Sequence, residues 1–212
     1  RMTSDRSLYT PGFRLYRKPA KGQLDFELES VFQAGHSRSS TAATNTRDLD
    51  HFAHFQHVEV GYTFAASWSP RLVLQFDYAS GDDNPNDNNN NRFDTLFGAR
   101  RFDFGPTGIY GPFARSNLIS PGYRLILKPH ATFEVMFAHR LYWLASDRDA
   151  WTTSGVRDAT GKSGSDLGTQ PEIQLRWDVW PGNVSLEAGA AYLFSGEFVE
   201  DAPNSNDEGD AS

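Results

Sequence analysis

Residues 122–143, GYRLILKPHATFEVMFAHRLYW, contain two runs in which apolar and polar side chains alternate, joined by a very short connection. A period of two is the spacing of a β-strand that has one apolar face. The connection Lys128-Pro129-His130 contains a proline, which lacks the N–H of a sheet hydrogen bond and suits a tight turn. These residues therefore predict an antiparallel hairpin with one apolar and one polar side.

The same alternation recurs along the chain and predicts about eight strands in all. Besides the two of the hairpin, they cover residues 9–18, 23–34, 48–66, 71–79, 171–180 and 184–194. Short turns at 19–22, 67–70, 129–130 and 181–183 alternate with long polar loops at 35–47, 80–115 and 146–168. Short turns at one side and long loops at the other are typical of an outer-membrane β-barrel. We therefore predict an all-β, antiparallel transmembrane barrel.

Composition agrees with this class and excludes several others. The 212 residues include no cysteine, so disulfides, thiolate metal sites and a catalytic thiol are excluded. A net charge of -7 argues against a nucleic-acid partner, because such binding draws on clustered Lys and Arg. The sequence has no run of about 18 apolar residues for a transmembrane helix, whereas a barrel strand needs only about 9–11 alternating residues.

The two faces of the strands differ in a way that suggests their surroundings. The polar positions carry full charges, and aromatic side chains such as Trp68, Trp143 and Trp180 gather near strand ends on the apolar face. Aromatic girdles of this kind lie at membrane interfaces. We predict that the apolar face contacts lipid and the charged face lines a lumen. The alternative is an exposed sheet with a solvated charged face.

The order of turns places both chain ends on the long-loop side, whereas bacterial barrels normally have both ends on the short-turn side. We therefore expect residues 1–212 to form a single barrel domain that is an internal piece of a larger barrel.

Several stretches resemble the alginate-export family of outer-membrane porins. They are residues 10–22, 55–64, 144–158 and 196–204 and, most specifically, the segment 77–122 with its sequence DYASGDDNPNDNNNNRFDTLFGARRFDFGPTGIYGPFARSNLISPG. The resemblance implies an 18-stranded monomeric barrel in the outer membrane of a Gram-negative bacterium, of which this chain is a central to C-terminal portion. It also implies passive export of an anionic polysaccharide through an arginine-lined lumen.

Export of a polyuronate requires cations at intervals along the path, which replace water around each carboxylate without retaining it. Arginine suits this task through its permanent charge and forked geometry. The candidates on the lumen face are Arg14, Arg71, Arg124, Arg140, Arg176 and Lys128. The same face carries at least as many acids, such as Glu134 and Glu172, so each arginine is equally a candidate for an ion pair that braces the barrel. This mixture keeps a general solute-specific porin open as the alternative.

The longest loop supplies two further candidate sites. Asp82, Asp83 and Asp87, with neighbouring asparagines, offer oxygen ligands for a weak Ca²⁺ site, although a solvated loop is the commoner explanation. Arg100 and Arg101, beside aromatic residues, can fold into the pore as a constriction or back over the rim.

No nucleophile elbow, metal-spaced histidine pair or phosphate loop is present, so we expect no enzyme activity and no cofactor. An outer-wall hydrolase using His139 and an adhesin or structural barrel acting through its loops remain alternatives. The expected partners are outer-membrane lipid, an anionic polysaccharide or small solute, and periplasmic export proteins.

Overall fold

The computed structural model describes residues 5–42, 44–95, 104 and 111–205, and its strands form one sheet. The elements are β1 (Arg6–Tyr9), β2 (Gly12–Arg17), β3 (Gln23–Ser37), β4 (Leu49–Thr63), β5 (Arg71–Ala79), β6 (Asn89–Asn90), β7 (Leu118–His130), β8 (Phe133–Trp143), β9 (Asp166–Trp180), β10 (Val184–Ala191), β11 (Phe194–Ser195) and α1 (Glu197–Asp201). Apart from the short parallel pairing of β6 with β4, all neighbours are antiparallel. The all-β antiparallel prediction is confirmed.

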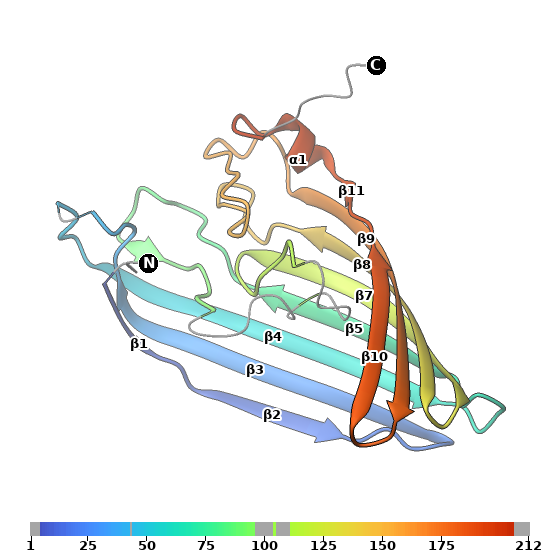
Figure 1. Cartoon of the computed structure of the whole chain (residues 1–212). Coiled ribbons are helices and arrows are strands. Elements are labelled where there is room, and N and C mark those ends of the chain that lie inside the picture. The colour runs from blue at the N-terminus through green and yellow to red at the C-terminus, as the bar shows by residue number, and fades with distance from the viewer. Residues whose placement is uncertain (1–4, 43, 96–103, 105–110, 206–212) are drawn as a thin grey trace, which may run out of the picture.

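The long strands follow one another in chain order across a curved wall (Figure 1). β1 and β2 pair with the two halves of β3 and act as one strand interrupted at Pro11, and β10 and β11 pair with β9 in the same way. The wall therefore consists of eight strands, as predicted. Within the described residues no pairing joins β10 to β1 or β2, so the sheet has two open edges and is not closed.

Short and long connections lie at opposite ends of the wall (Figure 1). The short ones are residues 18–22, 64–70, 131–132 and 181–183, and the long ones are residues 38–48, 80–117 and 144–165. This one-sided arrangement of loops was predicted and is confirmed. In the described part of the chain, no helix is long and apolar enough to cross a membrane.

Several predicted boundaries were wrong, including those of the hairpin turn, the start of β9 and the end of β3. The hairpin turn is at residues 131–132, because β7 continues through Pro129 to His130. Its register shifts between Leu127 and His130, and such an irregularity accommodates a residue without an N–H. β9 begins at Asp166 instead of residue 171, and β3 reaches Ser37, because these ends pair with neighbouring strands although their sequences do not alternate.

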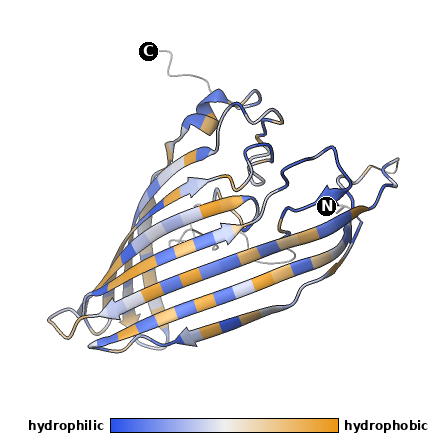
Figure 2. Ribbon diagram, turned by 180° about the vertical axis from the view of Figure 1, so that it is seen from behind, coloured by the Kyte–Doolittle hydropathy of each residue, from blue (hydrophilic) through white to orange (hydrophobic). Residues whose placement is uncertain are grey.

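Apolar and polar side chains alternate along each strand, which is visible as stripes in Figure 2. One face, here called the outer face, carries exposed apolar side chains on every long strand. Examples are Phe13, Leu24, Phe32, Val58, Val60, Leu74, Phe76, Tyr123, Phe137, Leu175, Trp177 and Leu186. The opposite inner face carries most of the charged strand residues, so the predicted separation of apolar and charged side chains onto two faces is confirmed.

At the long-loop end the inner face is covered by a cluster of buried apolar side chains. These are Ala53, Phe55, Ala79, Phe93, Phe104, Phe113, Leu118, Tyr142, Leu144, Leu167, Phe198 and Ala202. The rings of Phe113 and Tyr142 stack with centroids 3.6 Å apart, so the chain at Phe113 packs directly on β8. Described residues of the connections 80–117 and 144–165 therefore pack against the inner face at this end.

Candidate functional site

The inner face is crossed by rows of alternating charges that link neighbouring strands. In the first row Arg71 on β5 donates a hydrogen bond from Nε to Asp25 Oδ2 on β3, at 3.1 Å, and from Nη2 to Glu59 Oε1 on β4, at 2.9 Å. Arg124 on β7 donates to the other oxygen of Glu59. Each carboxylate is thus shared or flanked by guanidinium groups, and four strands are connected.

A second row lies nearer the long loops. His57 Nδ1 on β4 is 2.7 Å from Asp77 Oδ1 on β5. Arg140 on β8 donates to Asp77 Oδ2 and, from Nε, to Ser120 Oγ on β7 at 3.0 Å. The row is almost fully buried, since Asp77 and Arg140 each keep only 6% of their side-chain surface exposed.

The six predicted lumen cations all lie on the inner face, but the structure divides them into two groups. Those called here the wall arginines are Arg71, Arg124 and Arg140, whose side chains are 15%, 22% and 6% exposed. Those called the exposed cations are Arg14, Lys128 and Arg176, at 56%, 58% and 54%. Only the exposed cations can exchange their partners for a solute without first opening a buried ion pair.

Each exposed cation has an acidic neighbour within reach. Arg14 Nε is 2.7 Å from Glu27 Oε1, and Lys128 Nζ is 3.1 Å from Glu134 Oε2. Arg176 Nε is 3.8 Å from a carboxylate oxygen of Asp178 and 3.6 Å from one of Glu187. Ion pairs exposed to water contribute little to stability, about 0–1 kcal/mol each, so these cations exchange partners easily.

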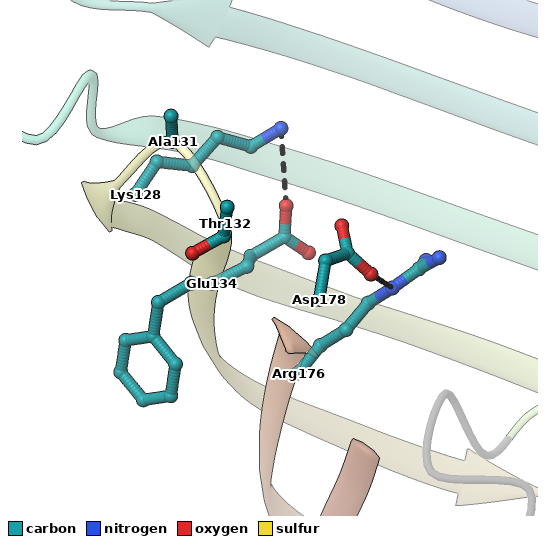
Figure 3. Close-up of a pocket in the computed structure, with 7 residues that line it drawn as sticks. Lys128, Ala131, Thr132, Glu134, Arg176 and Asp178 are labelled. Carbon is teal, nitrogen blue, oxygen red and sulfur yellow. Dashed lines mark ion pairs between the residues drawn. The ribbon is translucent and has the colours of Figure 1, made fainter. Parts of the chain in front are cut away.

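Lys128 and Arg176 line a pocket of about 230 Å³ beside the turn between β7 and β8. Its other lining residues are Ala131, Thr132, Phe133, Glu134 and Asp178, and Figure 3 shows the two ion pairs within it. The pocket lies at the short-turn end of the inner face and combines two cations with two carboxylates. It can accept an anionic group by displacing one of these carboxylates from its cation.

A family model described as alginate export matches residues 1–209, nearly the whole chain. The chain belongs to the alginate-export family. No curated protein matches it in a sequence search. The family match spans all eight strands of the wall, both groups of cations and the pocket, so the resemblance predicted from the sequence is confirmed.

The predicted loop sites of this alginate-export family member have different outcomes. Arg100 and Arg101 lie outside the described residues. Asp94, in the same segment, contacts the inner face: its N–H donates to Gln33 Oε1, and Gln33 Nε2 donates to its carbonyl, both at 2.8 Å. Phe104 and Phe113 belong to the buried cluster.

Among the described residues no three His, Asp or Glu side chains lie close enough together to hold a metal ion. Asp87 instead accepts a hydrogen bond from the N–H of Asn89 at 2.7 Å, in a local turn. The structure therefore does not gather Asp82, Asp83 and Asp87 into one ligand group, and calcium binding stays a prediction from the sequence.

A buried connection between two long loops was missed by the sequence reasoning, and it is called the loop clasp here. The fully buried Asp149 accepts hydrogen bonds from Arg92 Nε at 2.7 Å and from the Asp82 N–H at 2.9 Å, and Arg92 Nη2 also donates to it. Asn117 Oδ1 accepts from the Ser146 N–H at 2.7 Å. Burial, together with the nearby Asp149, raises the pKa of the Asp82 carboxyl. No periodic signal marks these residues in the sequence.

Asp158, in the loop 144–165 of this family member, closes a turn whose stability should depend on pH. Its carboxylate accepts hydrogen bonds from Thr160 Oγ1 and N–H at 2.7 and 2.8 Å and from the Ser163 N–H at 2.9 Å, which lower its pKa. Because the folded pKa is depressed, this stabilisation is complete above the unfolded value of about 3.9 and is lost as the pH falls below it.

We expect the amides of residues 158–163 to exchange faster as the pH falls from 5 to 3, after correction for intrinsic rates. Asp158→Asn removes much of this dependence, whereas the same change at the exposed Asp147 keeps it. A wild-type protection that is flat across this range contradicts the prediction.

Proposed function

We propose that this chain forms part of the wall of an outer-membrane channel through which an anionic polysaccharide is exported passively. The family match supports a role in polysaccharide export. The observation that carries the channel is the inner face, where Arg14, Lys128 and Arg176 are about half exposed and the last two line a pocket. Such cations can bind and release the carboxylates of a passing polysaccharide, because none of them holds a carboxylate too strongly.

The outer face supports a membrane position for the wall. On β3 the apolar side chains run from Leu24 to Phe32, with Ser30 between them. This stretch is about 26 Å long and, at a tilt of roughly 40°, spans about 20 Å of an apolar band about 25 Å tall. Aromatic pairs lie at both ends, with Tyr62 against Phe64 near the short turns and His54 against Tyr78 near the long loops.

Lipid also requires the two open edges to be paired, because unpaired backbone groups are not tolerated in the hydrocarbon region. We infer that the sheet continues into further strands of a larger, monomeric barrel, next to β1 and β2 at one edge and next to β10 at the other.

In a Gram-negative outer membrane the short turns face the periplasm. The pocket at the short-turn end then meets the polysaccharide first, and a periplasmic export partner would dock at this end.

A general solute-specific porin is the second candidate, and the balance of charge on the inner face favours it. The described strands carry more carboxylates than cations on this face. The carboxylates are Asp25, Glu27, Glu29, Glu59, Asp77, Glu134, Glu172, Asp178 and Glu187. A channel dominated by these acids would prefer cations.

Planar-bilayer conductance of the full-length protein distinguishes the two candidates. We expect anion preference and block by oligo-uronates. Lys128→Ala and Arg176→Ala should each weaken the block about two- to fivefold, the equivalent of roughly 0.5–1 kcal/mol for an exposed ion pair. Lys162→Ala, an exposed lysine of the loop 144–165, is the matched control and should change the block little. Cation preference without block supports the general porin, and the absence of conductance supports an adhesin or an enzyme.

A further inference from the structure

Arg71 lies flat across a neighbouring strand because that strand has a glycine at the crossing point. The side chain starts on β5, passes over β4 and reaches Asp25 on β3. The residue of β4 opposite Asp25 is Gly61. A Cβ atom added to Gly61 would lie 2.6 Å from Asp25 Oδ1 and 2.8 Å from Arg71 Nη2. The bridge between Arg71 and Asp25 therefore occupies the space that any other residue at position 61 would fill.

A similar arrangement recurs two strands further along the wall. Arg140 on β8 crosses β7 to reach Asp77 on β5, and the residue of β7 opposite Arg140 is Gly122. A Cβ added to Gly122 would lie 2.8 Å from Arg140 Cγ and 2.7 Å from the carbonyl oxygen of His139. Arginine, glycine and aspartate thus occupy three adjacent strands in both places.

Backbone conformation does not explain these two glycines. Neither has the positive φ that favours glycine over other residues. A glycine inside a strand weakens the strand by roughly 0.5–1 kcal/mol relative to alanine, so its presence within β4 and β7 needs another reason. At Gly61 the Arg71 guanidinium and the Asp25 carboxylate take up the space of a side chain, and at Gly122 the stem of Arg140 and the backbone of β8 do so.

We propose that Gly61 and Gly122 are positioning residues that set the bore and the charge of the channel by letting two wall arginines lie flat against the wall. The inference rests on the proposed channel function. When the arginine side chain lies across the glycine, its guanidinium group pairs with the aspartate. The charge is then neutralised and the group stays out of the path of the solute. A side chain at the same position lifts the guanidinium into the lumen, where it narrows the path and becomes available to an anion.

Gly61→Ala tests the proposal, because its added Cβ meets only the flexible ends of two side chains within 3 Å, whereas at Gly122 a backbone oxygen is also in the way. In a planar bilayer we expect Gly61→Ala to lower the conductance and to tighten block by oligo-uronates about two- to fivefold, the range for one exposed ion pair. In an Arg71→Ala background the same substitution should change neither quantity.

Thermal unfolding supplies a readout that does not depend on conduction. Gly61→Ala should lower the Tm of the wild type and raise that of Arg71→Ala, because alanine otherwise favours a strand over glycine. A Tm that rises in both backgrounds, with conductance unchanged, overturns the inference and leaves the channel intact. A wild-type protein that does not conduct overturns the proposed channel function and, with it, the role of Gly61 in setting the channel width. The sign of the Tm change still decides whether Gly61 positions Arg71.

Discussion

Asp149→Ala is expected to release the loop clasp and to expose the segments 80–95 and 144–165 to solvent exchange. The carboxylate is fully buried and is bonded by Arg92 and by the backbone N–H groups of Asp82 and Ala150. Removing one partner of a buried ion pair leaves the other charge uncompensated and costs about 3–5 kcal/mol. Arg92 keeps 35% of its side chain exposed, so we expect a value near 3 kcal/mol, at the lower end of that range.

The effect is measured by hydrogen exchange of the full-length protein, followed by peptide in the two segments. Amides that bond between β3 and β4 should keep their protection, because this pairing does not depend on the clasp. Asp147→Ala is the control, since that residue is exposed and lies only two positions earlier. Arg92→Ala in the Asp149→Ala background should recover part of the loss, because no unpaired buried charge remains. Unchanged exchange in Asp149→Ala would show that the clasp does not hold the loops.

Leu175→Arg is expected to destabilise the protein in lipid by about 2–4 kcal/mol, the cost of an arginine on the lipid face near the middle of an outer-membrane strand. Leu175 lies on the outer face of β9, between Val135 on β8 and Ala188 on β10. On a sheet in water the same substitution would change stability by no more than about 0.5 kcal/mol. The size of the loss of stability in Leu175→Arg therefore shows whether the outer face contacts lipid.

The measurement is urea unfolding of protein refolded into phospholipid vesicles. Gln174→Arg is the matched control, because position 174 is the adjacent residue and lies on the inner face, where Arg176 is already accepted. We expect Gln174→Arg to stay close to the wild type. Equal stabilities of the two variants would favour the alternative of a solvated sheet over a membrane wall.

Much of the fold was predictable because period-two alternation is a local property. It placed Leu125 and Leu127 on one face of β7 and Arg124 on the other without any knowledge of neighbouring strands. It failed at residues 166–170, DLGTQ, which do not alternate and are strand because β8 and β11 pair with them. It also failed at Pro129, where a proline that suggested a turn lies in an irregular part of the β7–β8 pairing.

The candidate site was predictable only in part. The alternation of residues along each strand placed all six cations on the inner face. It could not separate Lys128, which is largely exposed, from Arg140, which is buried. That difference depends on which residues of other strands lie opposite and on the loops that cover them. The cost of moving a charge out of water depends on these surroundings and is not encoded in the residue itself.

By itself, then, the sequence determined the eight strands, their two faces and the side on which the long loops lie, because each follows from the chemistry of residues one or two positions apart. Only the tertiary structure decided that Arg92 meets Asp149 and that Arg71 crosses Gly61 to reach Asp25. These contacts join residues far apart in the chain. They depend on the register of several strand pairings at once, for which no short stretch of sequence carries a signal.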